Sequence, residues 1–101
     1  MIGVFSECRS LKYLNIEKFD TTEVTTMKNM FYNCYSLTSL NISNFNTQSV
    51  TDMSHMFYNC SSLPSLDLKN FDTPKLIDIS NMFQLCTNMI ELNLPLFYTR
   101  N

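Results

Sequence analysis

The side chains with the most reactive chemistry in this 101-residue chain are four cysteines and one histidine. The cysteines recur at one constant interval, at Cys8, Cys34, Cys60 and Cys86. Zinc sites are usually built from close pairs such as CxxC, and their ligands must converge on a tetrahedron. A row of evenly spaced thiols does neither, so the spacing predicts no metal site.

Disulfide bonds are the second chemistry open to these cysteines. Neighbouring repeats would bring their thiols close to bonding distance. Each cysteine, however, falls on an apolar face of its repeat, and free cysteine is among the most buried residue types. We therefore favour buried free thiols over disulfides, and disulfides over a metal site.

Nucleophilic catalysis would need a partner for one of the thiols. His55 is the only histidine, and it is five residues from Cys60. On a helix this spacing points the two side chains to different sides, so they cannot act as a pair. The chain also has no GxSxG turn, GxxxxGK[ST] loop or GxGxxG loop. We expect a protein that is not an enzyme, with no catalytic residue and no cofactor.

The cysteines are one column of a repeat that fills the whole chain. Two phenylalanine columns share the same interval, which is typical of repeat architectures. We predict a single array of about four 26-residue repeats, with units near 1–26, 27–52, 53–78 and 79–101. The two columns are Phe5, Phe31, Phe57 and Phe83, and Phe19, Phe45, Phe71 and Phe97.

The first half of each repeat has the spacing of a short helix. Met53, Met56, Phe57 and Cys60 lie at i, i+3, i+4 and i+7, which is one helix face. Thr51 or Asp52 would cap its start, since a side-chain oxygen can accept a free backbone N–H. Asn33 and Asn59 stand where the helix should end, and asparagine tolerates the left-handed conformation of a C-cap.

The second half of each repeat predicts a strand. Leu63, Leu66 and Leu68 form an LxxLxL pattern, the core of the leucine-rich repeat. Pro64 precedes its alternating part, where we expect it to leave the strand ladder intact. The predicted fold is an α/β repeat solenoid, a leucine-rich-repeat-like right-handed coil. Its four short parallel strands are each preceded by a short helix.

The outward side chains of the strands form the candidate functional surface. One column within it is rich in amides, for which we weigh an amide ladder of mutual hydrogen bonds against a docking role. Three tyrosines on the helix side are further candidates: Tyr32, Tyr35 and Tyr58. The predicted protein-binding surface comprises Tyr13, Asn15, Ser39, Asn41, Ser65, Asp67, Glu91 and Asn93.

Charge and hydropathy exclude several classes of partner. Only 16% of the residues are charged, the net charge is −2, and the seven basic residues are scattered. No basic stripe could follow a phosphate backbone, so we predict no nucleic-acid partner. No apolar run is long enough for direct membrane insertion. The first residues, MIGVFSECRS, have no basic segment followed by an apolar one, so we predict no signal peptide.

The two ends of the array carry the ordinary apolar pattern of the repeat. Solenoids usually end in repeats with a polar outer face. We therefore expect the chain to be a fragment of a longer array. Its open sheet edges invite pairing with another chain, so we also expect self-association through the uncapped ends.

The phrase VTDMSHMFYNCSSLPSLDLKNFDT, with its relatives in the other units, resembles a known family. It is similar to the BspA-like leucine-rich repeat proteins, in particular the Mycoplasma-type lipoprotein repeat. The resemblance implies a surface or secreted protein whose repeats bind host or extracellular proteins without catalysis. We therefore expect a non-enzymatic protein-binding module of an adhesin-like protein. The alternatives are an intracellular repeat scaffold and a targeting module of a larger multidomain protein.

Overall fold

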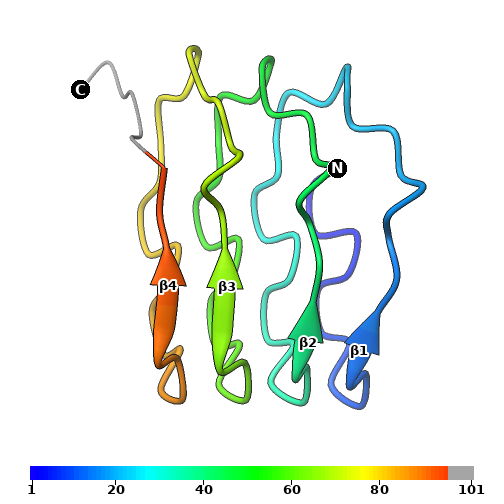
Figure 1. Ribbon diagram of the computed structural model, residues 1–101, viewed down its shortest axis with the longest axis vertical. Coiled ribbons are helices and arrows are strands. Elements are labelled where there is room, and N and C mark those ends of the chain that lie inside the picture. The colour runs from blue at the N-terminus through cyan, green and yellow to red at the C-terminus, as the bar shows by residue number, and fades with distance from the viewer. Residues whose placement is uncertain (96–101) are drawn as a thin grey trace.

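Four short strands, one in each repeat unit, lie side by side in chain order (Figure 1). The computed structural model describes residues 1–95, with overall dimensions of 33 × 26 × 20 Å. The predicted short parallel strands are confirmed, so the LxxLxL pattern located them correctly. The strands are β1 (Tyr13–Leu14), β2 (Ser39–Leu40), β3 (Ser65–Asp67) and β4 (Glu91–Asn93).

The strands form two parallel pairs rather than one sheet of four. In the pair of β1 and β2, Tyr13 lies opposite Ser39, and in the pair of β3 and β4, Ser65 lies opposite Glu91. Each residue is therefore paired with the one at the same repeat position of the neighbouring unit.

The sheet divides at Pro64. In the pair of β1 and β2, the N–H of Thr38 donates to the carbonyl of Lys12 at 2.7 Å. In the pair of β3 and β4, the N–H of Ile90 donates to the carbonyl of Pro64 at 2.8 Å. The matching bond between β2 and β3 would need an N–H on Pro64, and proline has none. The prediction that Pro64 leaves the ladder intact is wrong.

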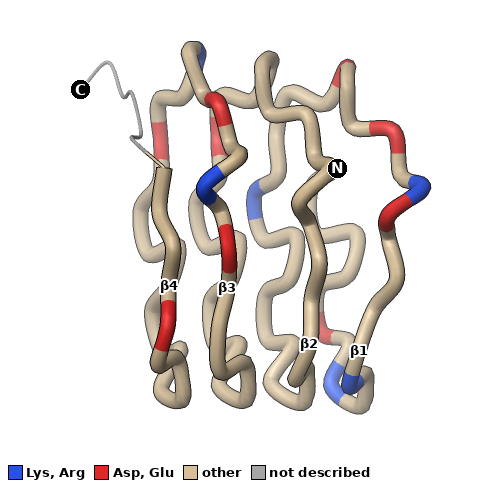
Figure 2. Tube along the Cα trace, in the orientation of Figure 1, with Lys and Arg blue, Asp and Glu red and all other residues tan. Residues whose placement is uncertain are grey.

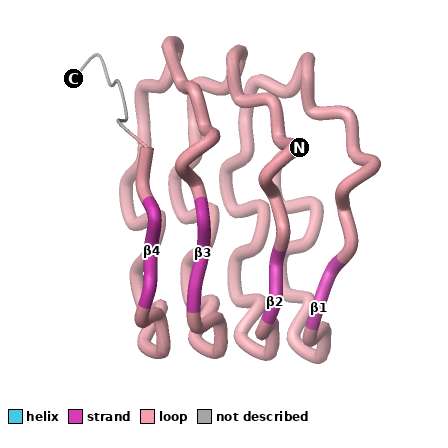
Figure 3. Tube along the Cα trace, viewed as in Figure 1, coloured by secondary structure: helices cyan, strands magenta, loops and turns pink. Residues whose placement is uncertain are grey.

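The predicted helices are absent from residues 1–95 (Figure 3). An α-helix joins every N–H to the carbonyl four residues earlier. Here the N–H of Met56 instead donates to Met53, three residues back, at 3.2 Å. The N–H of Phe57 leaves its own unit and donates to the carbonyl of Met82 at 3.0 Å. The segment is therefore a run of tight turns in which alternate N–H groups bind the next unit.

Two residues in each turn segment have the left-handed backbone conformation, which prevents a continuous helix. In the third unit these are His55, with φ 56°, and Asn59, with φ 57°. Asparagine and glycine adopt this region most readily. The left-handed conformation predicted for Asn33 and Asn59 is confirmed, whereas the helical position predicted for His55 is wrong. The equivalent residues are Gly3, Glu7, Asn29, Asn33, Asn81 and Leu85.

The residues predicted to face inward do so despite the different backbone. Met53, Met56, Phe57 and Cys60 are all fully buried. The ring of Phe57 stacks between those of its own column, at centroid distances of 5.5 Å and 5.7 Å. The predicted column member Phe97 lies outside the described residues. The core is thus a set of stacked columns that run from unit to unit.

Burial falls sharply in the two outer units. Met30 and Met56 in the inner units are fully buried, whereas Val4 at the same repeat position is 48% exposed. At the other end Leu68 is fully buried, but Leu94, one repeat later, is 51% exposed. An apolar column is therefore covered only where a further unit packs against it.

Two threonines of one column tie neighbouring units together at the turns that follow β1 and β2. The hydroxyl of Thr47 donates to the carbonyl of Asp72 at 2.8 Å and accepts its N–H at 3.1 Å. Thr21 makes the same pair of bonds with Asn46. These threonines are buried, so each hydroxyl satisfies two backbone groups that water cannot reach. The column member Thr99 lies outside the described residues.

Candidate functional site

The eight side chains predicted to bind protein, here called the strand surface, are all exposed. The structure gathers them into two shallow hollows. One, of about 210 Å³, lies over β1 and β2 and is lined by Tyr13, Asn15, Ser39 and Asn41 together with Leu14 and Glu17. The other, of about 250 Å³, lies over β3 and β4 and is lined by Ser65, Asp67, Glu91 and Asn93 together with Leu66.

The amide column of the strand surface caps its own turns. The side-chain oxygen of Asn41 accepts the N–H of Ser43 at 3.0 Å and its hydroxyl at 2.7 Å. Asp67 accepts the N–H of Lys69 at 3.1 Å in the same way. The expected ladder of mutual hydrogen bonds is not formed here. Two-residue turns of this kind are a strong local preference of Asn and Asp.

A short side-chain ladder occurs instead in the turn segments. The amide of Asn59 donates to the side-chain oxygen of Asn33 at 3.1 Å, and that of Asn33 donates to Glu7 at 2.9 Å. The hydrogen bond from Asn33, together with that from Arg9, lowers the pKa of the exposed Glu7 carboxyl. The sequence signal for this ladder is the pair of asparagines at one repeat position with left-handed backbone.

Acidic residues lie on β3 and β4 but not on β1 or β2 (Figure 2). Asp67 and Glu91 both belong to the hollow over β3 and β4, where Lys69 lies 3.7 Å from Asp67. The hollow over β1 and β2 has Glu17 as its one charged lining residue. A partner would therefore meet one carboxylate near a tyrosine in one hollow, and two carboxylates, one of them paired with Lys69, in the other.

A second aromatic group lies on the turn segments. The rings of Tyr32 and Tyr58 stack at 4.7 Å, and the ring of His55 lies 5.6 Å from that of Tyr58. His55 is also within hydrogen-bond distance of the Asn81 amide, at 3.2 Å. Its neighbours are thus tyrosines and an amide rather than Cys60. Tyr32 and Tyr58 are half-buried by each other, so they offer less free area than Tyr13, which is 73% exposed.

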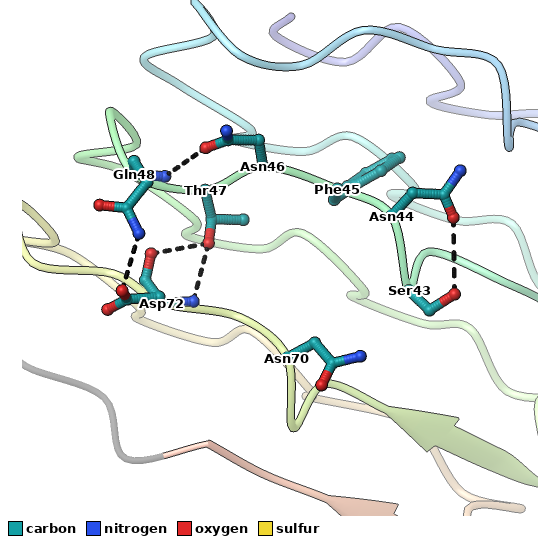
Figure 4. Close-up of a pocket in the computed structure, with 8 residues that line it drawn as sticks. All are labelled: Ser43, Asn44, Phe45, Asn46, Thr47, Gln48, Asn70 and Asp72. Carbon is teal, nitrogen blue, oxygen red and sulfur yellow. Dashed lines mark hydrogen bonds between the residues drawn. The ribbon is translucent and has the colours of Figure 1, made fainter.

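A polar cleft of about 310 Å³ lies between the loops of the second and third units (Figure 4). Its polar groups largely bind one another: the Gln48 amide donates to the Asp72 carboxylate at 2.7 Å, and Thr47 bridges to the same residue. Small-molecule sites usually have mainly apolar walls, and Phe45, the one aromatic lining residue, is buried. No motif in the sequence pointed to this cleft, which forms where the polar loops NFNTQ and NFDT face each other.

The cysteines are free, as predicted. Cys34 and Cys60 are buried, whereas Cys8 and Cys86 in the outer units are only partly covered. The Cys60 thiol donates to the carbonyl of Phe31 at 3.3 Å, and Cys34 repeats the bond to Phe5. Burial raises the pKa of Cys34 to about 11 and raises that of Cys60 further. A thiol held protonated is a poor nucleophile, so the geometry gives these groups a structural role.

The model of one protein family covers almost the whole chain. Described as "Mycoplasma protein of unknown function, DUF285", it matches residues 1–100. The chain belongs to this family. No curated protein matches this DUF285 chain, and neither does any solved structure.

The DUF285 description names no activity. The described residues of this DUF285 chain contain no group of three or more side chains that could hold a metal ion. They also contain no helix long and apolar enough to span a bilayer. Among the candidate surfaces, the strand surface contains Tyr13, whose side chain is more exposed than those of the turn-side tyrosines.

Proposed function

We propose that this DUF285 chain is a right-handed leucine-rich-repeat-like solenoid that binds a protein partner through its strand surface, without catalysis. As in the BspA-like proteins that it resembles, the setting would be the cell surface or the secreted fraction. The solenoid is supported by the regularity of its contacts: strand partners occupy equivalent positions of neighbouring units, and the turn bonds between units recur at one fixed separation along the chain.

The observation that carries the proposal is the exposure of all eight strand-surface side chains over two adjacent hollows. Hollows of this size are smaller than typical small-molecule sites, which span roughly 300–1,000 Å³. A broad, nearly flat surface with scattered polar groups instead fits a macromolecular partner. Because β1 and β2 are hydrogen-bonded to each other, the surface is held before binding, which lowers the ordering cost of association.

Tyr13 is the expected anchor of the contact. Tyrosine is enriched among the few residues that dominate interface energies. Burying this ring against a partner removes a large apolar area from water, while its hydroxyl keeps a hydrogen-bonding group. The neighbouring Asn15 and Asn41 add adaptable polar contacts at the edge of the same hollow.

The test measures binding of the purified chain to a panel of purified extracellular host proteins by biolayer interferometry. Tyr13→Ala should weaken any specific binding by about 2 kcal/mol, roughly 30-fold in Kd. Tyr35→Ala removes an exposed tyrosine of the turn side and serves as the matched control, with little expected effect. Binding that is lost in Tyr35→Ala but kept in Tyr13→Ala would contradict the proposal, because it would place the interface on the turn side.

A second candidate is an intracellular repeat scaffold. Its support is the set of four free thiols, because reduced cysteines are typical of reducing compartments. A third candidate is a targeting module of a larger multidomain protein. In that case the same surface would bring an adjoining domain to the binding partner. Treating intact cells with a protease distinguishes the settings, since a surface protein is cleaved and an intracellular one is protected until lysis.

A further inference from the structure

Neighbouring units are joined by a regular row of backbone hydrogen bonds on the turn side. The N–H groups of Asn29 and Phe31 donate to carbonyls of the next unit, at 3.1 Å and 2.9 Å, and Asn33 follows at 2.9 Å. Every second residue of the row donates. Each unit therefore presents a row of N–H groups to the unit after it and a row of carbonyls to the unit before it.

At the C-terminal edge of the described chain this row has donors without acceptors. Asn81, Phe83 and Leu85 occupy the donor positions, yet none of their N–H groups binds a backbone carbonyl within residues 1–95. Because these N–H groups are in line with those of the inner units, they would satisfy an incoming segment of the same geometry. An unpaired row of this kind is a template for another chain.

The N-terminal edge carries the complementary row. The carbonyls of Ile2, Val4 and Ser6 occupy the acceptor positions, and none receives a backbone N–H from residues 1–95. Both rows come from the same repeat positions, so their spacing matches without adjustment. The repeat itself thus sets the register in which the two edges fit.

Apolar side chains accompany both rows. At the N-terminal edge Ile2 is 65% exposed and Val4 is about half exposed, and at the C-terminal edge Leu85 is 48% exposed. Phe5 and Phe83 are partly covered at the ends of the aromatic column, where Phe31 and Phe57 are fully buried. Each edge therefore leaves uncovered the side chains that a further unit covers inside the array.

We propose that these edges bind each other, so that copies of this chain associate head to tail. The fourth unit of one chain would receive the first unit of the next, with the N–H groups of Asn81, Phe83 and Leu85 donating to the carbonyls of Ile2, Val4 and Ser6. The Phe83 ring stacks on Phe5 of the next chain, at the spacing of 5.7 Å that joins Phe57 to Phe83.

Such a contact is heterologous, because the two surfaces are different. Each added chain exposes a new free edge, so association proceeds to open linear oligomers rather than closed dimers. At one position this contact between chains lacks a side-chain hydrogen bond that joins neighbouring units within one chain. Leu85 replaces the asparagine that makes the side-chain ladder, so it forms no hydrogen bond with Glu7 of the next chain.

The first test is sedimentation velocity of residues 1–101 across a wide concentration range. We expect the parent chain to form concentration-dependent oligomers, and Val4→Glu and Ile2→Glu to stay monomeric with unchanged circular dichroism. Each substitution puts a charge in the proposed contact at a position that is exposed in the single chain. Ser39→Glu, an exposed position on the inner strand β2 and at neither edge, is the control that should still associate. A parent chain that is monomeric throughout overturns the proposal, as do edge variants that associate like the parent.

The second test checks the register. In the proposed contact Tyr13 of the next chain lies beside Glu91, as Ser39 lies beside Tyr13 within one chain. Neighbouring strands are about 4.8 Å apart, within the Cα range of disulfides. Tyr13→Cys combined with Glu91→Cys, both in a chain whose partly covered Cys8 and Cys86 are replaced by serine, should give covalent oligomers on mild oxidation, and adding Val4→Glu should prevent them. Tyr13→Cys with Ser65→Cys is the control that should not cross-link chains; cross-linking equal to that of the test pair overturns the register.

Discussion

The phenylalanine column offers a test of how much neighbouring units stabilise one another. Phe57 is fully buried and stacks on a ring at each side, whereas Phe83 stacks on Phe57 and is only partly covered. The two residues have the same chemistry and the same repeat position. Replacing each with alanine therefore varies the surroundings and little else.

Phe57→Ala should lower the free energy of unfolding by about 3–5 kcal/mol, because it leaves a cavity in a closed core. Each lost ring stack accounts for about 0.5–1.5 kcal/mol of such a change. Phe83→Ala loses one stack and opens toward solvent, so about half that cost is expected. A domain of this size has roughly 5–15 kcal/mol of stability, so the first variant should lose a large share of it.

The assay is urea unfolding followed by circular dichroism, at a protein concentration low enough to keep the chain monomeric. The parent chain and both variants should share one slope with denaturant, so that midpoints report stability. Equal destabilisation by Phe57→Ala and Phe83→Ala would refute the reasoning, because it would mean that stacking between units does not set the burial of the column.

Three further predictions follow from single positions. Pro64→Thr restores an N–H opposite the carbonyl of Thr38 and should raise stability by about 0.5–1.5 kcal/mol, measured by urea unfolding; a decrease would contradict the assignment of the sheet break to proline. Leu85→Asn should stabilise the chain by roughly 1 kcal/mol in the same assay, because leucine is strained at φ 64° and asparagine is not. The Cys34 thiol titrates at a pKa of about 11 against 9.0 for an ordinary thiol, so its contribution to stability is full below pH 9.0 and is lost as pH rises through 11. Unfolding midpoints should fall over that range, less so in Cys34→Ala, and Cys34 and Cys60 should react slowly with thiol reagents at neutral pH.

The inward columns could be predicted from the sequence because burial follows the order of side chains along the chain. The backbone of the turn segments could not. The spacing of Met53, Met56, Phe57 and Cys60 suits a helix face, but it also suits successive turns that return each apolar residue to the same side. The cue was the pair Asn29 and Asn33 in the second unit, of which only Asn33 was interpreted as a left-handed helix end.

The strand surface, too, could be predicted in part. The exposure of its side chains followed from alternation along each strand, so Tyr13 and Asn41 lie where the sequence placed them. The hydrogen bonds of these side chains could not be predicted from the alternation. A hydrogen bond within the local turn competes with one to the next unit, and small differences in distance decide between them. The polar cleft around Asp72 depends on loops of two units meeting, which no single repeat reveals.

The alternation of donors and acceptors on the turn side also determines how the length of this chain can change. Removing residues 27–52, which make up one whole unit, would place the first unit against the third with every donor still facing a carbonyl. Deleting a single residue such as Met56 would exchange donors for acceptors from that point onward and turn the buried columns outward. Insertions and deletions should therefore be tolerated in whole units and rejected in fractions, so the molecule can be lengthened or shortened without designing a new interface.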